Sequence, residues 1–197
     1  MDAASVGCAW TNGARATVYL LEYPDGNKLV LKKYKPGHFK WMMRDYLNSM
    51  YVSMRLSNVP KLLHFSLIKR ELVFSYVRGT RVLEWVLQQF GDPGLDILEF
   101  LNFEAMDTDH RIVRAFKRFR DSDSEPARRL KQAIRDSYAR LHAVGIQHGT
   151  ADPRNVIYDE RQVYIIDFDR ARPAWNRRKV DYRALTYWFG VYPEFPK

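Results

Sequence analysis

The chain has 197 residues, 46% of them hydrophobic and 14% aromatic, which suits one domain, or one domain divided into two small lobes, and excludes wholesale disorder. Its 32 Lys and Arg residues outnumber 23 Asp and Glu residues, which gives a net charge of +9. Such a charge attracts anions, for example nucleotides, phospholipids, nucleic acids or acidic proteins. The alternative is a generally basic protein without a dedicated anionic partner. Because it has one cysteine, no signal-peptide-like start and no apolar run near the roughly 20 residues of a membrane span, we expect no disulfide and a soluble, cytoplasmic protein.

The first part of the chain begins with strand signals. Residues 17–21 are β-branched and aromatic, residues 24–27 (Pro-Asp-Gly-Asn) are a turn cluster, and residues 29–31 resume the apolar run. This order predicts a β-hairpin between Arg15 and Lys35.

A helix and two further strands are predicted after this hairpin. Four apolar residues recur at spacings of four, three and four, namely Met43, Leu47, Met50 and Met54. This period predicts a helix over residues 39–56. Strand-like runs follow at residues 62–68 and 71–76.

The second part of the chain is predicted to be mostly helical. Its best helix covers residues 127–144, where apolar residues line one face and Gly145 supplies a C-terminal stop. A two-stranded hairpin follows, with strands at residues 156–158 and 163–166. Further helices are predicted at residues 83–90, 95–103, 111–119 and 181–189.

Polar residues on either side of the second hairpin indicate phosphoryl-transfer chemistry. The block His148-Gly149-Thr150-Ala151-Asp152-Pro153-Arg154-Asn155 precedes the hairpin, and Asp167-Phe168-Asp169 follows it. Phosphoryl transfer needs a divalent cation, and hard cations prefer oxygen ligands such as an Asn amide and an Asp carboxylate. Because a hairpin folds back on itself, Asn155 and Asp167, 12 positions apart, can end near each other as metal ligands.

This order resembles the protein-kinase catalytic loop, H-R-D-x-x-x-x-N, followed by D-F-G. His148 matches the His, Asn155 the Asn, and Asp167-Phe168 the first two residues of D-F-G. Residues 164–171 (YIIDFDRA) are especially similar to the lipopolysaccharide-kinase branch of that superfamily. The resemblance covers roughly residues 13–189. It implies an α+β, two-lobed, kinase-like fold, with an antiparallel sheet and one helix in residues 1–78 and a reduced, mostly helical lobe in residues 79–197.

The resemblance also implies that ATP and Mg²⁺ are the cofactors. Lys32 would be the strand lysine that contacts the α and β phosphates, and Lys33 is its rival because neighbouring strand residues point to opposite faces. Gly13 and Val18 are the two residues that match the Gly-rich loop G-x-G-x-x-G-x-V. Backbone groups of residues 75–79 would take an adenine edge.

The main departure from the kinase pattern is Thr150, which occupies the position of the catalytic Asp. A threonine hydroxyl cannot act as an anionic base near pH 7, and general bases typically contribute about 10²–10⁴-fold. Asp152 is a candidate surrogate, because Pro153 favours an extended conformation that puts the side chains of residues 150 and 152 on one face. The alternative is that Asp152 caps a local turn through its own backbone.

Two more departures concern the flanking segments. Kinases carry a Glu in the first helix to pair with the strand lysine, whereas Asp45 is the only acid in residues 39–56, which leaves the partner of Lys32 open. Only 28 residues follow Asp169, so most of the peptide-docking part of a kinase is absent from the sequence, although Asp181 begins a segment that resembles one of its helices.

We therefore predict a kinase-like protein that binds ATP and Mg²⁺ and has weak or no phosphotransferase activity, a pseudokinase, because Thr150 replaces the aspartate. The alternative is an active atypical kinase that phosphorylates a non-peptide hydroxyl on a sugar, lipid or small molecule, with Asp152 as base. A third option, suggested by charge alone, is a basic module that binds anions or nucleic acid, but no zinc-finger, RRM or basic-helix signature supports it. The predicted partners are a nucleotide and an unknown acceptor or protein, for which an acidic surface would suit the charge.

Overall fold

The structure is a computed structural model that describes residues 5–93, 109–174 and 179–191. The helix predicted at residues 95–103 lies outside the described residues. The chain forms two compact units, Met1–Val77 with Asp167–Arg170, and Arg78–Ile166 with Ala171–Lys197. The short segment Asp167–Arg170 therefore belongs to the first unit, although its neighbours in the chain on both sides belong to the second.

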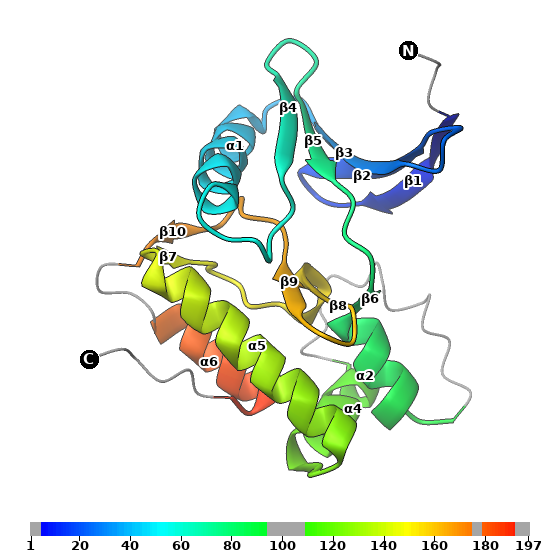
Figure 1. The fold of residues 1–197 in the computed structure, drawn as a ribbon, viewed down its shortest axis with the longest axis vertical. Helices are drawn as coiled ribbons and strands as arrows, with labels where there is room; N and C mark the ends of the chain where they lie inside the picture. Colours follow the sequence, from blue (N-terminus) through cyan, green and yellow to red (C-terminus); the bar gives the residue numbers. More distant parts are fainter. Residues whose placement is uncertain (1–4, 94–108, 175–178, 192–197) are drawn as a thin grey trace. The chain divides into compact units, whose positions relative to one another are not determined.

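The first unit is a five-stranded antiparallel sheet with one helix (Figure 1). Its spatial order is β1-β2-β3-β5-β4, and each neighbouring pair is antiparallel. The predicted hairpin is β2–β3, and this sheet with its helix confirms the predicted α+β class. The elements are β1 (Ser5–Asn12), β2 (Ala16–Glu22), β3 (Lys28–Tyr34), α1 (Phe39–Ser53), β4 (Leu62–Ser66) and β5 (Glu71–Ser75).

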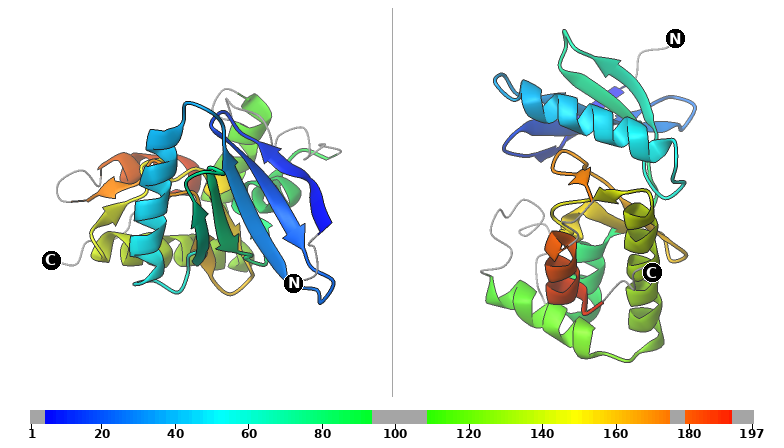
Figure 2. Two further views of the ribbon diagram at one scale, coloured as in Figure 1. Left: turned by 90° about the horizontal axis from the view of Figure 1, so that it is seen from above. Right: turned by 90° about the vertical axis from the view of Figure 1, so that its left-hand side faces the viewer.

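Helix α1 runs alongside the sheet, as both views of Figure 2 show, and packs one side against it. Met42 is fully buried in a core with Tyr34 and Leu72, residues of β3 and β5. The buried side of α1 consists of Met42, Asp45, Ser49 and Val52. The spacing that predicted this helix marks a different side, because Leu47 and Met54 are 51% and 75% exposed.

The second unit is mainly helical and contains two small antiparallel sheets, β6-β8-β9 and β7-β10 (Figure 1). The predicted second hairpin is β8–β9, and the predicted helices within the described residues are present. No described helix is both long and apolar enough to cross a membrane. The elements are β6 (Thr80–Arg81), α2 (Val82–Phe90), α4 (His110–Asp121), α5 (Glu125–Ala143), β7 (Ile146–Gln147), the 3₁₀ turn η2 (Pro153–Asn155), β8 (Val156–Tyr158), β9 (Val163–Ile165), β10 (Arg172–Pro173) and α6 (Lys179–Phe189).

An aromatic core joins α4 to α6 in the second unit. The buried residues of α4 recur at helical spacing and include Phe116 and Phe119. The ring of Phe116 lies 5.0 Å from that of Trp188 and 6.1 Å from that of Phe189, both in edge-on geometry. Trp188 and Phe189 at the end of α6 therefore pack in the core, whereas their neighbour Tyr187 is 43% exposed.

Asp181 of α6 holds the loop that follows α5. Its fully buried carboxylate accepts hydrogen bonds from the backbone N–H groups of His148 and Gly149, both at 2.7 Å, and from Nε2 of His142 at 2.9 Å. Burial alone would raise the pKa of Asp181, but the hydrogen bonds from His142 and Gly149 outweigh it and hold that pKa below its usual value. One ionised carboxylate thus ties α6, α5 and the loop together.

We expect the substitution Asp181→Asn to lower the free energy of unfolding by about 2–4 kcal/mol, because a neutral amide loses the charge-assisted bonds and turns an N–H₂ group towards buried donors. Urea unfolding at several pH values measures this. A carboxylate with a depressed folded-state pKa stabilises above its unfolded pKa of about 3.9 and loses that effect as the pH falls through the folded value. The difference from wild type should therefore be constant near neutral pH and shrink below about pH 4.

The matched control is Asp136→Asn, which changes an exposed carboxylate of α5 that accepts a bond from Gln132. It should change stability by less than about 0.5 kcal/mol. Equal effects of the two substitutions would contradict the structural role of Asp181.

Candidate functional site

A largely buried lysine lies at the centre of the first unit. Lys32 of β3 is 13% exposed, and its Nζ lies 2.7 Å from Oδ2 of Asp45 and 2.6 Å from Oδ1 of Asp167. Lys33 points to the other face of the sheet, where it is 50% exposed and pairs with Glu71 at 3.3 Å. Of the two lysines that the sequence left open, Lys32 is therefore the one that points inward.

Asp45 of α1 is the partner of Lys32 that the sequence did not identify. Its carboxylate is 1% exposed and also accepts hydrogen bonds from the hydroxyl of Tyr34 at 2.7 Å and the hydroxyl of Ser49 at 3.1 Å. A fourth bond comes from the backbone N–H of Phe168 at 3.2 Å. Asp45 thus makes the lysine–acid pair that a Glu makes in the kinase pattern, and it also anchors the Asp167–Arg170 segment.

Two more side chains hold this segment. Arg15 Nη1 lies 2.7 Å from Oδ2 of Asp169, and Asn48 Nδ2 donates to the carbonyl of Phe168 at 3.0 Å. Asp167 has a φ of +65°, in the left-handed region that residues other than glycine seldom adopt. Such conformations cost about 1–3 kcal/mol and cluster at functional sites, so the unusual backbone points to a constraint on where this carboxylate is held.

The charges of this cluster leave a net negative site. Burial works against the charge of Lys32, but the carboxylates of Asp167 and Asp45 outweigh it and hold the pKa of Lys32 well above its usual value. Burial, and then the charge of Asp167, raise the pKa of Asp169. Three carboxylates thus face two cations, Lys32 and Arg15, so that three minus two leaves one negative charge when all are ionised.

This arrangement fits a divalent cation such as Mg²⁺ in both charge and ligand type, because carboxylate oxygens are hard ligands. Within the described ranges, no group of three or more His, Cys, Asp or Glu side chains is placed to hold a metal ion. Mg²⁺ is usually bound through one or two carboxylates together with phosphate oxygens and water, and such a site needs no larger cluster.

The predicted phosphate-loop residues lie on the same sheet. Val18 of β2 is directly opposite Lys32 in the β2–β3 register, so the two side chains share one face. Gly13 lies in the turn between β1 and β2, where its N–H donates to the carbonyl of Ala16 at 3.0 Å. A Cβ at Gly13 would lie 3.2 Å from the same oxygen, a tight contact that favours glycine, the residue without a Cβ.

In the second unit, Thr150 is hydrogen-bonded to the histidine of its own loop. Thr150 Oγ1 lies 2.8 Å from Nδ1 of His148, and His148 Nε2 lies 2.8 Å from the carbonyl oxygen of Ile166. A carbonyl only accepts, so Nε2 carries the ring proton and Nδ1 is an acceptor. The Thr150 hydroxyl therefore donates to His148.

Asp152 caps the short turn that follows. Its Oδ1 accepts from the backbone N–H of Arg154 at 2.9 Å and from Nε at 3.0 Å, and its Oδ2 accepts from Nη2 at 2.6 Å. This is the turn-capping arrangement that the sequence left as an alternative, with both carboxylate oxygens engaged by one residue. A catalytic role for Asp152 stays a prediction.

Asn155, the second predicted metal ligand, ends the same turn. Its backbone N–H donates to the carbonyl of Asp152 at 2.9 Å, and its carbonyl accepts from the N–H of Ile166 at 3.0 Å. Asn155 belongs to the second unit and Asp167 to the first, and their joint binding of a metal stays a prediction.

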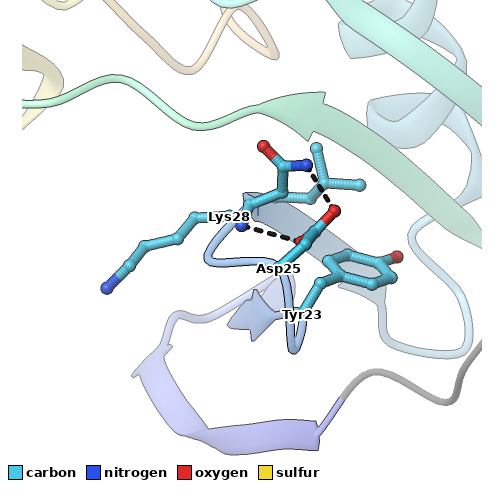
Figure 3. Close-up of a pocket in the computed structure, with 5 residues that line it drawn as sticks. Tyr23, Asp25 and Lys28 are labelled. Carbon is cyan, nitrogen blue, oxygen red and sulfur yellow. Dashed lines mark hydrogen bonds between the residues drawn. The ribbon is translucent and has the colours of Figure 1, made fainter.

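An open pocket at the β2–β3 turn is lined by Tyr23, Asp25, Asn27, Lys28 and Leu29 (Figure 3). The two dashed lines of Figure 3 join Asp25 to Asn27: the carboxylate accepts from the backbone N–H at 3.0 Å and from Nδ2 at 2.7 Å. These bonds stabilise the turn itself. They explain the turn cluster that predicted the hairpin, and we assign no chemistry to this pocket.

The chain matches the Lipopolysaccharide kinase (Kdo/WaaP) family over residues 13–187. This range contains Lys32, Asp45, Thr150 and Asp167, in both units. A search of curated proteins found no match. The match confirms the resemblance noted in the sequence and, with the α+β architecture, the kinase-like fold. Because it extends over most of the sequence, the chain belongs to the lipopolysaccharide kinase (Kdo/WaaP) family.

Proposed function

We propose that this kinase-like protein binds ATP with Mg²⁺ through the cluster around Lys32, in the unit formed by Met1–Val77 and Asp167–Arg170. The observation that carries the proposal is the pair of contacts of Lys32 Nζ with Asp45 at 2.7 Å and Asp167 at 2.6 Å. Asp45 orients the ammonium group from α1, and the two carboxylates keep it protonated. In the nucleotide-bound protein, Lys32 would contact phosphate oxygens and Asp167 would turn to Mg²⁺.

The net negative charge of the cluster supports the metal part of the proposal. A divalent cation at Asp167 would offset the charge that raises the pKa of Asp169. Asn155 is proposed as the second protein ligand on the family motif, since an amide oxygen is a hard donor. Gly13 and Val18 are proposed to cover the nucleotide from the β1–β2 hairpin.

We further propose that turnover is weak, because neither candidate base is suited to the task. Thr150 is a neutral hydroxyl that donates a hydrogen bond to His148, and Asp152 is engaged by Arg154. An active kinase with a sugar hydroxyl as acceptor is the second candidate, and membership of a lipopolysaccharide kinase family favours it. In that case the general base would be Asp152 after release from Arg154.

We expect 5 mM ATP with Mg²⁺ to raise the thermal midpoint of wild-type protein. At about 100 times the dissociation constant, the linkage amounts to about 2.7 kcal/mol, or roughly 5–10 °C for a chain of this size. Lys32→Met should abolish the rise, because it removes the phosphate contact and unbalances the buried carboxylates. The readout is the difference in midpoint with and without nucleotide, so a lower baseline does not obscure it.

Lys33→Met is the matched control, since Lys33 is the exposed neighbour on the same strand. It should keep the full nucleotide shift. A wild-type protein without any shift at millimolar ATP, or equal loss in both variants, would overturn the proposed site.

Release of γ-phosphate to water tests the second part of the proposal without an identified acceptor. We expect Thr150→Asp to increase turnover by about 10²-fold or more, since general bases contribute about 10²–10⁴-fold. Asp152→Ala should leave wild-type turnover within about twofold, because its carboxylate is bonded to Arg154. Loss of turnover in Asp152→Ala would instead identify Asp152 as the working base and support the active-kinase candidate.

A further inference from the structure

The loop that lacks a catalytic aspartate holds a nucleophile and a base in contact. The Thr150 hydroxyl donates to Nδ1 of His148 at 2.8 Å, and the opposite nitrogen of the ring is fixed by the Ile166 carbonyl, also at 2.8 Å. A hydroxyl, a base within hydrogen-bond reach and a third group that orients the base are the features of an activated nucleophile.

His148 is held rigidly in this role. Its side chain is fully buried, its backbone N–H is bound by Asp181 at 2.7 Å, and the ring of Tyr138 packs edge-on at 6.3 Å. The ring can therefore not turn to exchange its two nitrogens without breaking buried contacts. Thr150 itself is only half-buried, in contrast to the fully buried His148.

The backbone next to Thr150 is also constrained. Ala151 is fully buried and has a φ of +43°, which is unfavourable for any residue with a Cβ. Strain of this kind persists where the surrounding structure fixes a particular side-chain position. Here the two neighbours of Ala151 are Thr150, bound to His148, and Asp152, bound to Arg154.

We propose that Thr150 is itself a phosphoryl acceptor, which takes the γ-phosphoryl group of a bound nucleoside triphosphate. In this step a bond forms between Thr150 Oγ1 and the γ-phosphorus, and the bond between that phosphorus and the bridging oxygen breaks. The electron pair leaves with the nucleoside diphosphate, and the hydroxyl proton passes to Nδ1 of His148. The inference rests on the proposed nucleotide binding.

The test incubates the whole protein with γ-labelled ATP and Mg²⁺, maps the label by peptide mass spectrometry, and measures the nucleotide-induced thermal shift on the same samples. We expect up to one phosphate per chain on Thr150, with Thr80 and Thr186 unlabelled in the same digest. Thr150→Ser should keep the label, and the isosteric Thr150→Val should lose it while the thermal shift persists. His148→Gln should slow labelling by about 10²–10⁴-fold and keep the shift.

The outcomes separate this inference from the proposed function. A thermal shift without label on Thr150 overturns the inference alone. Labelling of His148→Gln at the wild-type rate also overturns it, because His148 would then have no role as a base. Equal labelling of Thr80 overturns it as well, because the label would then not be specific to Thr150. Absence of both shift and label overturns nucleotide binding and the inference with it. Should His148→Gln fail to fold, the comparison of Thr150→Ser with Thr150→Val still decides.

A separate observation concerns the outer side of α1 and its C-cap residue Met54, where five apolar side chains form an exposed stripe. At 100° per residue they fall within an arc of about 120°, and the stripe is about 22 Å long. The members are Phe39 (55% exposed), Leu47 (51%), Met50 (38%), Tyr51 (37%) and Met54 (75%).

The positive charges around the stripe indicate which kind of surface would bind to it. Lys40 and Arg44 lie along one border of the arc, and the guanidinium of Arg55 lies 3.8 Å above the ring of Tyr51 at its end. Asp45 is the only acid of α1, and it is buried on the opposite side. A second copy of the chain would bring like charges together, whereas an apolar stripe bordered by Lys and Arg suits the surface of an anionic lipid bilayer.

The structure points to peripheral binding of α1 to anionic membranes, with the stripe inserted among the acyl chains and the cations at the headgroups. We expect the protein to sediment with vesicles of phosphatidylglycerol and phosphatidylcholine but not with pure phosphatidylcholine. Leu47→Ser combined with Met54→Ser should weaken binding by about tenfold or more. Both sites are exposed, so the thermal midpoint should stay unchanged.

Val180→Ser changes an exposed apolar residue of α6 and serves as the matched control, which should bind like wild type. Binding of the double variant at wild-type strength, or no binding to either vesicle, would overturn the membrane surface. A dimer in sedimentation that the double variant abolishes would do so as well, because it would show that a second copy covers the stripe.

Discussion

The contact on which the first unit depends is that of one largely buried ammonium group with two carboxylates. Lys32 comes from β3, Asp45 from α1 and Asp167 from the segment that returns from the second unit, so a single cluster connects three distant parts of the chain. Buried charges are tolerated only when they are paired and hydrogen-bonded, and removal of one partner leaves the others uncompensated. Lys32 therefore links α1 to Asp167–Arg170, in addition to the Met42 core that packs α1 and the contacts of Arg15 and Asn48 with the segment.

The second unit contains a comparable buried hydrogen-bond network, which fixes the loop around His148 and does not involve the side chain of residue 150. Asp181 binds the backbone of His148 and Gly149, and the Ile166 carbonyl fixes the His148 ring. Asp181 and the Ile166 carbonyl thus fix this loop without any contribution from a carboxylate at position 150. This explains how a threonine can occupy the central position while the loop keeps an ordered hydrogen-bond pattern, and why an intact loop says little about catalytic strength.

Local patterns predicted much of this fold, and long-range pairing limited the rest. The β2–β3 and β8–β9 hairpins, α1 and α5 follow from turn residues and from periodicities of two and 3.6, which are properties of neighbouring residues. The choice between Lys32 and Lys33 depends on which face of the sheet is covered. The pair Arg15–Asp169 joins residues 154 positions apart, and no spacing rule connects them. The stripe of α1 shows that a helical period identifies a face without showing what covers it.

The unfavourable free energy of burying charges around Lys32 bears on the proposal that this protein binds a nucleotide. Replacing a whole buried ion pair by apolar residues of similar volume is often neutral or stabilising, so stability alone does not explain why charged rather than apolar side chains occupy this place. The cluster further includes Asp169, whose raised pKa shows that its charge is disfavoured, and a strained Asp167 backbone. These unfavourable features would be offset together by one ligand that brings phosphate oxygens to Lys32 and a divalent cation to Asp167. The physical argument for nucleotide binding is therefore stronger than the argument for turnover, which depends on a loop whose two candidate bases are a neutral hydroxyl and an occupied carboxylate.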